Sequence, residues 1–267
     1  MGQVKDKKIK IAFVLYHEYQ DLWRDGLWAA INLLSYDYEV TVLNLWGALF
    51  PPDLSEYSFV LGWGAFGSPV DKLLSQCNNR RGLCIAGVSQ PTTLNSYDVL
   101  FYETQWFLPQ IEEHPNCVHA FGVNTDIYKP IRMKKIFDYI TVGAFAYWKR
   151  QVLLLNKGGI KIAIGEIQKS NVAESLEIVG ELLMGGVAVM DMIEPRLLAL
   201  LYNASKNVYI PANIAGGGER AVLEARSCGI PVEVESDNPK LMELCCGPVW
   251  DHCYYHSQLK KGIQSCL

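Results

Sequence analysis

Apolar and polar positions alternate along the first half of the chain in blocks that predict strands and helices in turn. Lys8–Tyr16 and Tyr38–Leu45 are nearly continuous apolar runs of strand length, and Asp21–Leu34 between them has the spacing of an amphipathic helix. The same order continues as far as Phe121. Because strands that alternate with helices build parallel sheets, this pattern predicts a doubly wound α/β sheet.

The second half of the chain repeats this pattern after an interruption. A proline ends the segment Ile127–Pro130, and the polar stretch Ile131–Lys135 follows it. We therefore predict a hinge that joins an N-terminal domain, residues 1–130, to a C-terminal domain, residues 131–267. Two Rossmann-like domains of this kind would face a central cleft at the carboxyl ends of both sheets, where open α/β folds bind ligands. The helices predicted for the second domain lie near residues 149–155, 173–183, 195–203 and 219–227.

Length and composition fit two folded, soluble domains. Of the 267 residues, 50% are hydrophobic and 19% are charged, which is enough apolar side chain for two cores and excludes disorder. A net charge of −4 provides no chain-wide positive field, so nucleic acid is not expected as a partner. No apolar stretch approaches the roughly 20 residues of a membrane span, and no signal-peptide pattern opens the chain. We expect a cytoplasmic protein without a transmembrane segment.

Cysteine and histidine gather only near the C-terminus. The eight cysteines are spread too thinly to indicate a disulfide framework, and reduced thiols are expected. The tail contains Cys245, Cys246, His252, Cys253 and His256. Their spacing loosely resembles a zinc site, but no Cys-x2-Cys pair occurs and adjacent cysteines fit one tetrahedral ion poorly. We therefore expect no metal site.

The strongest local signal is a glycine-rich segment between a predicted strand and a predicted helix. The strand ends at Ile210, the helix begins at Glu219, and three consecutive glycines precede the helix directly. Unhindered peptide N–H groups at the positive end of a helix suit a phosphate. A tight strand-to-helix loop also needs glycine whatever it binds, so the glycines alone leave both interpretations open.

Arg220 and Glu224 lie four residues apart on the predicted helix. This spacing fits a surface ion pair that contributes about 0.3–0.5 kcal/mol. It equally fits a site in which Glu224, one turn into the helix, accepts hydrogen bonds from sugar or ribose hydroxyls.

The run Leu223–Val232 closely resembles a segment of the retaining GT-B glycosyltransferases, above all those of glycosyltransferase family 4. Further segments resemble that family in the same order along the chain: Gly122–Pro130 before the linker, Ile140–Gly143 with Lys149 in the first strand and phosphate-contacting lysine of the donor domain, and Leu200–Ser205 in the helix before the motif strand. Several matches in order are more specific than any one of them. The resemblance implies a GT-B fold with an acceptor-side N-terminal domain and a C-terminal domain that binds a nucleotide sugar.

The resemblance also implies roles for particular residues. Glu224 would hold the donor ribose, and Lys149 would hold the diphosphate together with the helix dipole, in the absence of a metal. We predict catalytic roles for Glu219, Lys149 and Asp25. The predicted donor-binding residues are Gly143, Lys149, Arg150, Gly216, Gly217, Gly218, Glu219, Arg220 and Glu224.

Two positions depart from the family pattern. The first glutamate of the family's Glu-x7-Glu motif falls on Gly216, so either Glu219 replaces it or no carboxylate does. The arginine that often follows the glycine of the first donor-domain strand is Ala144 here. Arg150 or Arg220 would then supply the second cation.

Acceptor-binding residues are expected at the carboxyl end of the first strand. His17, Asp21, Arg24 and Asp25 gather there. They either bind an acceptor or form an ordinary helix N-terminus in which Asp21 is the cap or a first-turn acid. Trp63, which follows a strand between two glycines, is a candidate platform for a sugar ring, although core packing is the more usual role of tryptophan. The family's glycine-rich loop after the first strand and its mid-domain histidine have no counterpart in this sequence.

Together these observations predict a retaining, metal-independent glycosyltransferase that moves a sugar from a nucleotide diphosphate donor to a hydroxyl acceptor on a glycan, lipid or protein. No cofactor is expected. The alternative is a degenerate GT-B protein that binds nucleotide or glycan without catalysis, because the first motif glutamate is missing. A dinucleotide-dependent enzyme is disfavoured because no Gly-x-Gly-x-x-Gly follows the first strand. Homo-oligomerisation and peripheral contact with a membrane are both compatible with the sequence.

Overall fold

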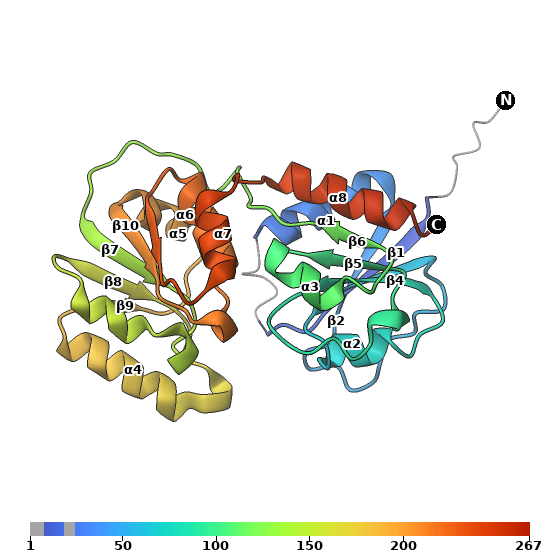
Figure 1. Ribbon diagram of the computed structural model, residues 1–267, viewed down its shortest axis with the longest axis horizontal. Coiled ribbons are helices and arrows are strands. Elements are labelled where there is room, and N and C mark those ends of the chain that lie inside the picture. The colour runs from blue at the N-terminus through green and yellow to red at the C-terminus, as the bar shows by residue number, and fades with distance from the viewer. Residues whose placement is uncertain (1–7, 19–24) are drawn as a thin grey trace. The chain divides into compact units, whose positions relative to one another are not determined.

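The chain forms two α/β units, each built around one parallel sheet (Figure 1). The computed structural model describes residues 8–18 and 25–267. Within this described part, the first unit consists of residues 8–18, 27–121 and 252–267. The second unit consists of residues 25–26 and 122–251.

The first sheet has six parallel strands in the order β2-β1-β3-β4-β5-β6. Strand β1 lies between β2 and β3, and its residues 11–15 are all buried. Such a run without polar positions is typical of a parallel strand that is covered on both faces. The strands are β1 (Lys10–Leu15), β2 (Glu39–Asn44), β3 (Phe59–Gly64), β4 (Arg80–Ile85), β5 (Val99–Tyr102) and β6 (Cys117–His119).

Three helices connect these strands: α1 (Gly26–Asp37), α2 (Pro69–Leu74) and α3 (Leu108–Ile111). Local sequence explains where α2 begins. The Ser68 side chain accepts a hydrogen bond from the Asp71 amide at 3.3 Å, while the proline follows at the first helical position, where no N–H is needed.

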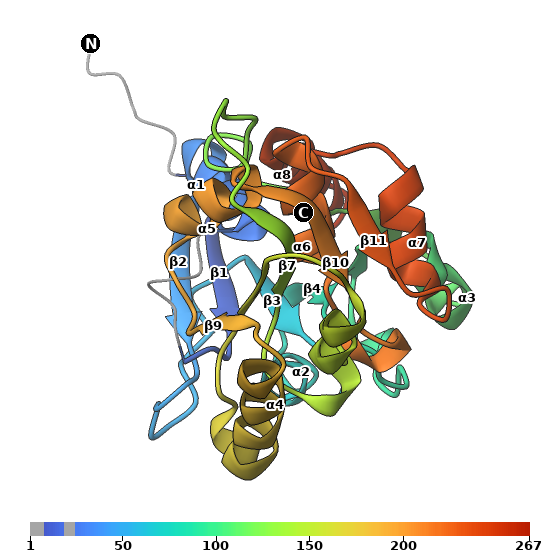
Figure 2. The same ribbon diagram turned by 90° about the vertical axis from the view of Figure 1, so that its left-hand side faces the viewer.

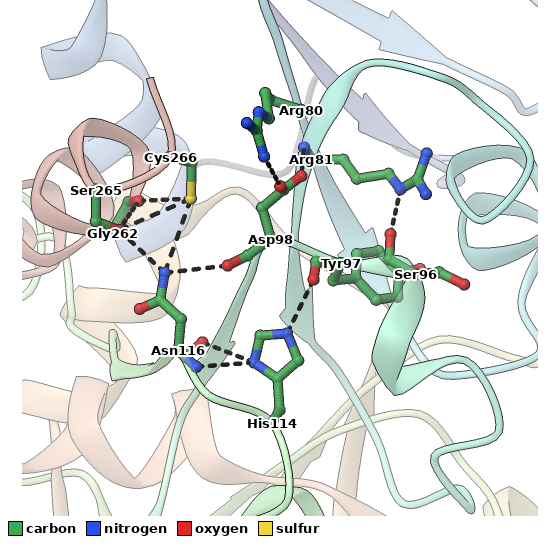
Figure 3. Close-up of polar contacts among 10 residues, drawn as sticks. All are labelled: Arg80, Arg81, Ser96, Tyr97, Asp98, His114, Asn116, Gly262, Ser265 and Cys266. Carbon is green, nitrogen blue, oxygen red and sulfur yellow. Dashed lines mark hydrogen bonds and ion pairs between the residues drawn. The ribbon is translucent and has the colours of Figure 1, made fainter.

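The C-terminal helix α8 (His252–Gln264) belongs to the first unit. It approaches β5 closely at Gly262, where a methyl group would lie 2.4 Å from the ring of Phe101. Beyond the helix, the Asn116 side chain donates a hydrogen bond to Ser265 Oγ at 3.0 Å (Figure 3). The end of the chain is therefore fastened to the β5–β6 side of the first sheet.

The second sheet has five parallel strands in the order β11-β10-β7-β8-β9, and Figure 2 turns this unit toward the viewer. The central strand of the order, β7, is half-buried at its ends and buried at Ile140 and Thr141. The strands are β7 (Phe137–Val142), β8 (Lys161–Ile164), β9 (Ala188–Met190), β10 (Ser205–Ile210) and β11 (Val232–Val234).

Four helices accompany this sheet: α4 (Val172–Met184), α5 (Pro195–Asn203), α6 (Glu219–Ser227) and α7 (Pro239–Cys246). The buried cluster between α4 and the sheet consists of Phe145, Leu154, Ala163, Ile178, Leu182, Val187 and Tyr209. Among all the helices in the described residues, none has both the length and the apolar character that crossing a bilayer requires.

The structure confirms two parallel, doubly wound sheets, and α5 and α6 have the bounds that the sequence predicted. The α-helix predicted near residues 149–155 was wrong. Two short 3-10 helices, η4 (Tyr147–Lys149) and η5 (Gln151–Asn156), occupy this stretch. They are separated by Arg150, whose φ of 50° lies in the left-handed region and interrupts a continuous helix.

The unit boundaries differ from the predicted division into residues 1–130 and 131–267 at three places. Residues 25–26 belong to the second unit, the main part of that unit begins at Gly122, and α8 belongs to the first unit. Backbone pairing explains the earlier start, because the Val123 amide donates a hydrogen bond to the Trp250 carbonyl at 3.0 Å. The segment before the predicted hinge is thereby tied into the second unit.

Candidate functional site

The glycine-rich loop of the second unit lies between the carboxyl end of β10 and the first turn of α6. Gly217 has φ 51° and ψ −170°, and Gly218, the N-cap of α6, has φ 127°. Side chains rarely adopt these backbone conformations, so glycine is required at both positions. The first N–H groups of α6 follow this loop directly and have no partner within the helix. They form the positive end of the helix dipole. This is the geometry of an anion site, provided that cations stand beside it.

Gly216 is a glycine for a different reason. A methyl group on this residue would lie 2.4 Å from the Trp148 carbonyl oxygen and 2.9 Å from the Ala212 side chain. The backbone of η4 therefore occupies the space that a side chain at this position would need. No glutamate fits where the family pattern has its first motif carboxylate.

Two asparagines hold the loop from behind. The Asn213 side chain accepts a hydrogen bond from the Ala215 amide at 3.0 Å and caps the short helix η7 (Ile214–Gly216). Asn238, fully buried just before α7, donates from Nδ2 to the carbonyl oxygens of Ala212 and Asn213 at 3.0 and 2.9 Å. The loop is thus fixed before any ligand arrives.

Lys149 reaches the front of this loop from the end of η4. A methyl group on Gly217 would lie 3.4 Å from Lys149 Nζ, and one on Gly143 would lie 3.7 Å from the same atom. Across the described part of the chain, Nζ has no hydrogen bond or ion pair. Burial lowers the pKa of Lys149 to about 8; the nearby Glu219 carboxylate opposes this, while Arg220 adds to it. The Lys149 ammonium therefore has no ion-pair partner among the described residues.

Glu219, the first residue of α6, is 7% exposed and lies between two lysines. Its Oε1 forms an ion pair of 2.6 Å with Nζ of Lys240, a side chain with no exposed surface. Its Oε2 points the other way, because a methyl group on Gly217 would lie 3.3 Å from it. Burial alone would raise the pKa of the Glu219 carboxyl, but Lys240 brings the pKa below its usual range. Glu219 is therefore an ionised carboxylate at neutral pH.

Glu224 lies one turn further along α6, in a pocket lined by tyrosines. Tyr202 donates from its hydroxyl to Glu224 Oε2 at 3.2 Å, and Tyr128 also hydrogen-bonds to the carboxyl. Burial raises the pKa of Glu224 to about 7; Arg220 opposes this rise and Asp25 adds to it. At neutral pH this carboxyl therefore exchanges readily between its charged and neutral forms.

Arg220 and Asp25 form an ion pair of 2.5 Å within the second unit. Asp25 is 7% exposed and precedes α1, and a methyl group on its neighbour Gly26 would lie only 1.8 Å from the Gly122 carbonyl oxygen. This close approach fixes the backbone that carries Asp25. The structure therefore brings one predicted catalytic residue to a predicted donor-binding residue, 195 positions away.

Arg150, the other candidate second cation, is held by neighbours in the same unit. Its guanidinium forms two parallel hydrogen bonds with the Asp237 carboxylate, at 2.8 and 2.7 Å, and donates from Nε to the Pro211 carbonyl at 2.7 Å. Two parallel charge-assisted hydrogen bonds of this kind are strong and fix the orientation of the guanidinium. Its guanidinium braces the start of the glycine-rich loop.

In the first unit, His17 and Trp63 lie together at the carboxyl ends of β1 and β3, with ring centroids 6.4 Å apart. Asn44, the last residue of β2, holds the loop after β1: it accepts from the His17 amide at 3.1 Å and donates to the His17 carbonyl at 2.7 Å. Next to this pair, the rings of Tyr16 and Trp46 meet edge to face at 5.0 Å. Aromatic faces of this kind suit a sugar ring.

Two predicted acceptor residues, Asp21 and Arg24, lie outside the described residues. The described part of the first unit also contains an open groove of about 340 Å³ beside the loop after β2. Leu49 and Phe50 on this loop are 89% and 81% exposed. The groove is lined by Leu45, Ala48, Leu49, Phe50, Pro51, Pro69, Lys72, Leu73 and Gln76.

Several residues of the second-unit site carried no assigned role in the sequence prediction. Tyr202 lies in the segment that resembles the family, but a buried tyrosine was not distinguishable there from core. Lys240 and Asn238 belong to a stretch with no motif, and an isolated lysine predicts a solvated position. An Asn-Pro pair that starts a helix does indicate a cap, and this is the one signal that pointed to Asn238.

The histidines and cysteines near the C-terminus do not assemble into a cluster. Among the residues that the structure describes, no group of three or more histidine, cysteine or acidic side chains has the arrangement of a metal site. Cys246 and Cys253 are exposed and form no disulfide within the described residues. The expectation that the protein needs no metal remains a prediction.

Solved structures resemble this chain, whereas no protein-family model and no curated protein matches it. Sucrose-phosphate synthase from Thermosynechococcus elongatus aligns with a TM-score of 0.66 at 13% identity, over 96% of this chain and 90% of that one. HepE from Anabaena, in complex with UDP and glucose, aligns at 0.64 and 14% identity, over 97% and 89%. A putative UDP-N-acetylglucosamine 2-epimerase from Listeria monocytogenes aligns at 0.52 and 12% identity, over 96% and 88%.

These alignments cover nearly the whole of each chain and extend over both sheets. At 12 to 14% identity they establish the fold and nothing finer. The chain has the GT-B fold of two Rossmann-like α/β units, as the sequence predicted.

Proposed function

We propose that the protein is a retaining, metal-independent glycosyltransferase that moves a sugar from a nucleotide diphosphate donor to a hydroxyl acceptor. One observation carries the proposal: the unpaired Lys149 ammonium stands beside Gly217, at the positive end of α6. Glycosyltransferases are among the solved structures of similar fold, and HepE was solved with UDP-glucose, which supports a nucleotide sugar as the ligand.

The diphosphate is the part of the donor that this site suits best. When the bond between the sugar and the diphosphate breaks, negative charge develops on the leaving phosphate. Lys149 donates to this phosphate, and the N–H groups of Gly218 and Glu219 add the helix dipole. A lysine and a helix N-terminus together do what a divalent cation does in other transferases, so no metal is required by this proposal.

Glu224 would accept hydrogen bonds from the ribose hydroxyls, with Tyr202 holding the carboxyl in place. Arg220 stays near the donor through its ion pair with Asp25. The Glu219 carboxylate faces the sugar side of the loop in place of the missing first motif glutamate. These roles follow the family resemblance, with Glu219, Lys149 and Asp25 as the reactive set.

The acceptor would bind at the carboxyl edge of the first sheet. His17 and Trp63 form its described part, and Asp21 and Arg24 are proposed alongside them. Retention of configuration is part of the proposal, and the anomeric coupling constants of the product report it by NMR.

Titration calorimetry with UDP, GDP and ADP tests the donor site. We expect at least one nucleotide to bind, and both Lys149→Met and Glu224→Ala to weaken that binding. Lys134→Met, which removes an exposed lysine of the same unit, is the matched control and should bind normally. Equal affinity in all four proteins would refute the site. A donor-hydrolysis screen with and without EDTA then tests turnover and metal independence.

The missing carboxylate at Gly216 also favours a second candidate, a GT-B protein that binds nucleotide or glycan without catalysis. This candidate predicts nucleotide binding with no release of sugar in any acceptor mixture. Two epimerases are among the structures of similar fold, at TM-scores of 0.52 and 0.51. Product analysis of UDP-N-acetylglucosamine without acceptor therefore separates epimerisation from transfer.

A further inference from the structure

The start of α7 forms the back wall of the glycine-rich loop. Asn238 hydrogen-bonds to two carbonyl groups of the loop, and Lys240, two residues later, reaches Glu219 in the first turn of α6. Both side chains have no exposed surface. One short segment therefore fixes both the backbone of the loop and the charge behind it.

A lysine in this position needs an explanation. Taking an ammonium group out of water is costly, and replacing a buried ion pair by apolar residues of similar volume is often neutral or stabilising. Packing alone would be served by a methionine. The function of the Lys240 ammonium is therefore to be found in its effect on Glu219, the carboxylate with which it forms an ion pair.

Glu219 has two cations within reach and is paired with only one. Lys240 holds Oε1 at 2.6 Å, whereas Lys149 lies on the side of Oε2 and has no ion pair within the described chain. Without Lys240, Lys149 would be the nearest unpaired cation to a buried carboxylate. A buried charge takes the best partner available to it, so Glu219 would then turn to Lys149.

We propose that Lys240 is a positioning residue for the diphosphate: by holding the Glu219 carboxylate from behind, it keeps the Lys149 ammonium unpaired and ready for the phosphate. This inference rests on the proposed function for the identity of the anion. It assigns Lys240 no contact with the donor.

The electrostatic surroundings of Lys149 give this role a specific signature. Glu219 and Arg220 face it from α6, Lys240 from α7 and Glu166 from the segment after β8. In the wild-type protein the pKa of Lys149 is lowered to about 8, mainly by burial. Lys240→Met removes one cationic neighbour and frees Glu219 to pair with Lys149. Both changes raise the pKa of Lys149.

The experiment follows UDP affinity between pH 6.5 and 10 in four proteins. Wild-type affinity should fall as the pH rises through about 8. For Lys240→Met we expect binding at pH 7 to be weaker by at least about tenfold, because UDP must displace Glu219. The pH at which affinity falls should also move upward by at least about one unit. A purely structural loss would weaken binding at every pH and leave that midpoint in place.

The double variant Lys240→Met/Glu219→Gln supplies the rescue. It removes both partners of the buried ion pair, so neither is left without the other and the protein should fold even if the single variant does not; near-UV circular dichroism checks this. The proposed role of the Glu219 carboxylate is toward the transferred sugar, which UDP lacks. We therefore expect the UDP affinity of the double variant at pH 7 to return to within about threefold of wild type, with affinity again falling as the pH rises through about 8. A double variant that binds as weakly as the single one would overturn the proposal.

Lys157→Met is the matched control. Lys157 forms an ion pair of 2.6 Å with Glu233 in the same unit but has no part in the loop. Lys157→Met should change neither the affinity for UDP nor the pH at which that affinity falls. Wild-type behaviour of a folded Lys240→Met protein would also overturn the proposal.

Lysine-selective 13C NMR separates this proposal from the proposed function. The Lys149 signal, assigned with Lys149→Met, reports its pKa without any nucleotide. If Lys240→Met raises that pKa while UDP, GDP and ADP all fail to bind, the positioning role stands and the proposed function fails. If nucleotides bind and Lys240→Met leaves the pKa of Lys149 unchanged, the proposed function stands and the positioning role fails.

Discussion

Two regions of the molecule, the surroundings of the glycine-rich loop in the second unit and the loop after β2 in the first, depart from the usual distribution of residues in opposite directions. In the second unit, charged side chains are inside: Glu219 is 7% exposed, Glu224 8% and Lys240 not at all. In the first unit, large apolar side chains are outside, with Leu49 at 89% and Phe50 at 81%. Buried charges and exposed apolar groups both cost free energy, so both indicate function.

The two regions differ in how this free-energy cost is compensated. Glu219, Glu224 and Lys240 each have a partner within the second unit, so these parts of the site are in place before a ligand binds. In the first unit, Leu49 and Phe50 on the exposed loop line an open groove instead. The glycine-rich loop of the second unit is therefore preorganised, while the described part of the first unit offers an open groove beside the loop after β2.

The largest effect is expected from restoring the family's missing glutamate. Gly216→Glu would force a side chain into the Trp148 carbonyl, at 2.4 Å, and displace the loop. Overpacking of this kind costs about 1–3 kcal/mol. Loss of the loop contacts should weaken UDP binding on the order of 100-fold. Calorimetry and urea unfolding measure the two effects.

Gly180→Ala is the control for that substitution. Gly180 lies in α4 with open space around its Cα, so alanine there should stabilise the protein by up to about 1 kcal/mol. If Gly216→Glu instead bound UDP normally or gained turnover, the explanation for the missing carboxylate would be wrong.

The next largest effect on UDP binding is expected from removing the Lys149 ammonium. Lys149→Met should weaken UDP binding by about 10- to 100-fold at pH 7, the value of a charged hydrogen bond. Because the pKa of Lys149 is lowered to about 8, the ammonium is lost above that pH and the variant and wild type should converge by pH 10. A pH-independent difference would contradict this reading of the site.

The same variant should be more stable than wild type at pH 7. A lysine whose pKa falls on folding destabilises the protein while it is charged, below about 8, and this penalty disappears as the pH rises toward its unfolded value. Urea unfolding should therefore show a larger gain at pH 7 than at pH 10, because pH 10 lies between the folded and the unfolded pKa of Lys149.

Glu224→Gln is expected to act on stability in the opposite pH range. The pKa of Glu224 is raised to about 7, so its ionisation destabilises the folded protein above the unfolded pKa of 4.5, and the penalty reaches its full size above about 7. The variant should therefore gain roughly 2 kcal/mol more at pH 8.5 than at pH 5. Equal gains at both pH values in urea unfolding would show that Glu224 is not the titrating group.

The smallest effect belongs to the first unit. Phe50→Ser removes a side chain that is 81% exposed, so we expect a change in stability within about 0.5 kcal/mol and unchanged UDP affinity. Leu74→Ser, at a position with no exposed surface, is the contrasting control and should cost several times more. A large loss from Phe50→Ser would mean that the loop is part of the core.

The sequence predicted those features that depend on neighbours along the chain. The parallel sheets followed from apolar runs, and α6 followed from the glycines before it and Gly229 after it. Both are confirmed because backbone conformation is set locally. The break at Arg150 was missed because a left-handed backbone is uncommon for a residue other than glycine, and the side chain's partner, Asp237, lies 87 residues away.

The difference between local and distant causes also explains which residues of the site could be predicted. Gly217 and Gly218 are recognisable because few residues tolerate their backbone angles. Lys240 was not recognisable, since burial of a lysine is decided by a partner on another helix. In the first unit, His17 and Trp63 lie together at the ends of β1 and β3, but nothing local indicated that Asn44 holds the loop after β1.

The return of α8 to the first unit has a consequence for biosynthesis. Its contact partner Phe101 leaves the ribosome long before Gly262 does, because the whole of residues 122–251 is made in between. At roughly 5–20 residues per second, that interval is on the order of ten seconds. The second unit can complete its sheet during this time, while the first sheet still lacks the helix that lies against β5 and β6. The first unit to be started is thus the last to be finished, and it needs protection from aggregation for the longer period.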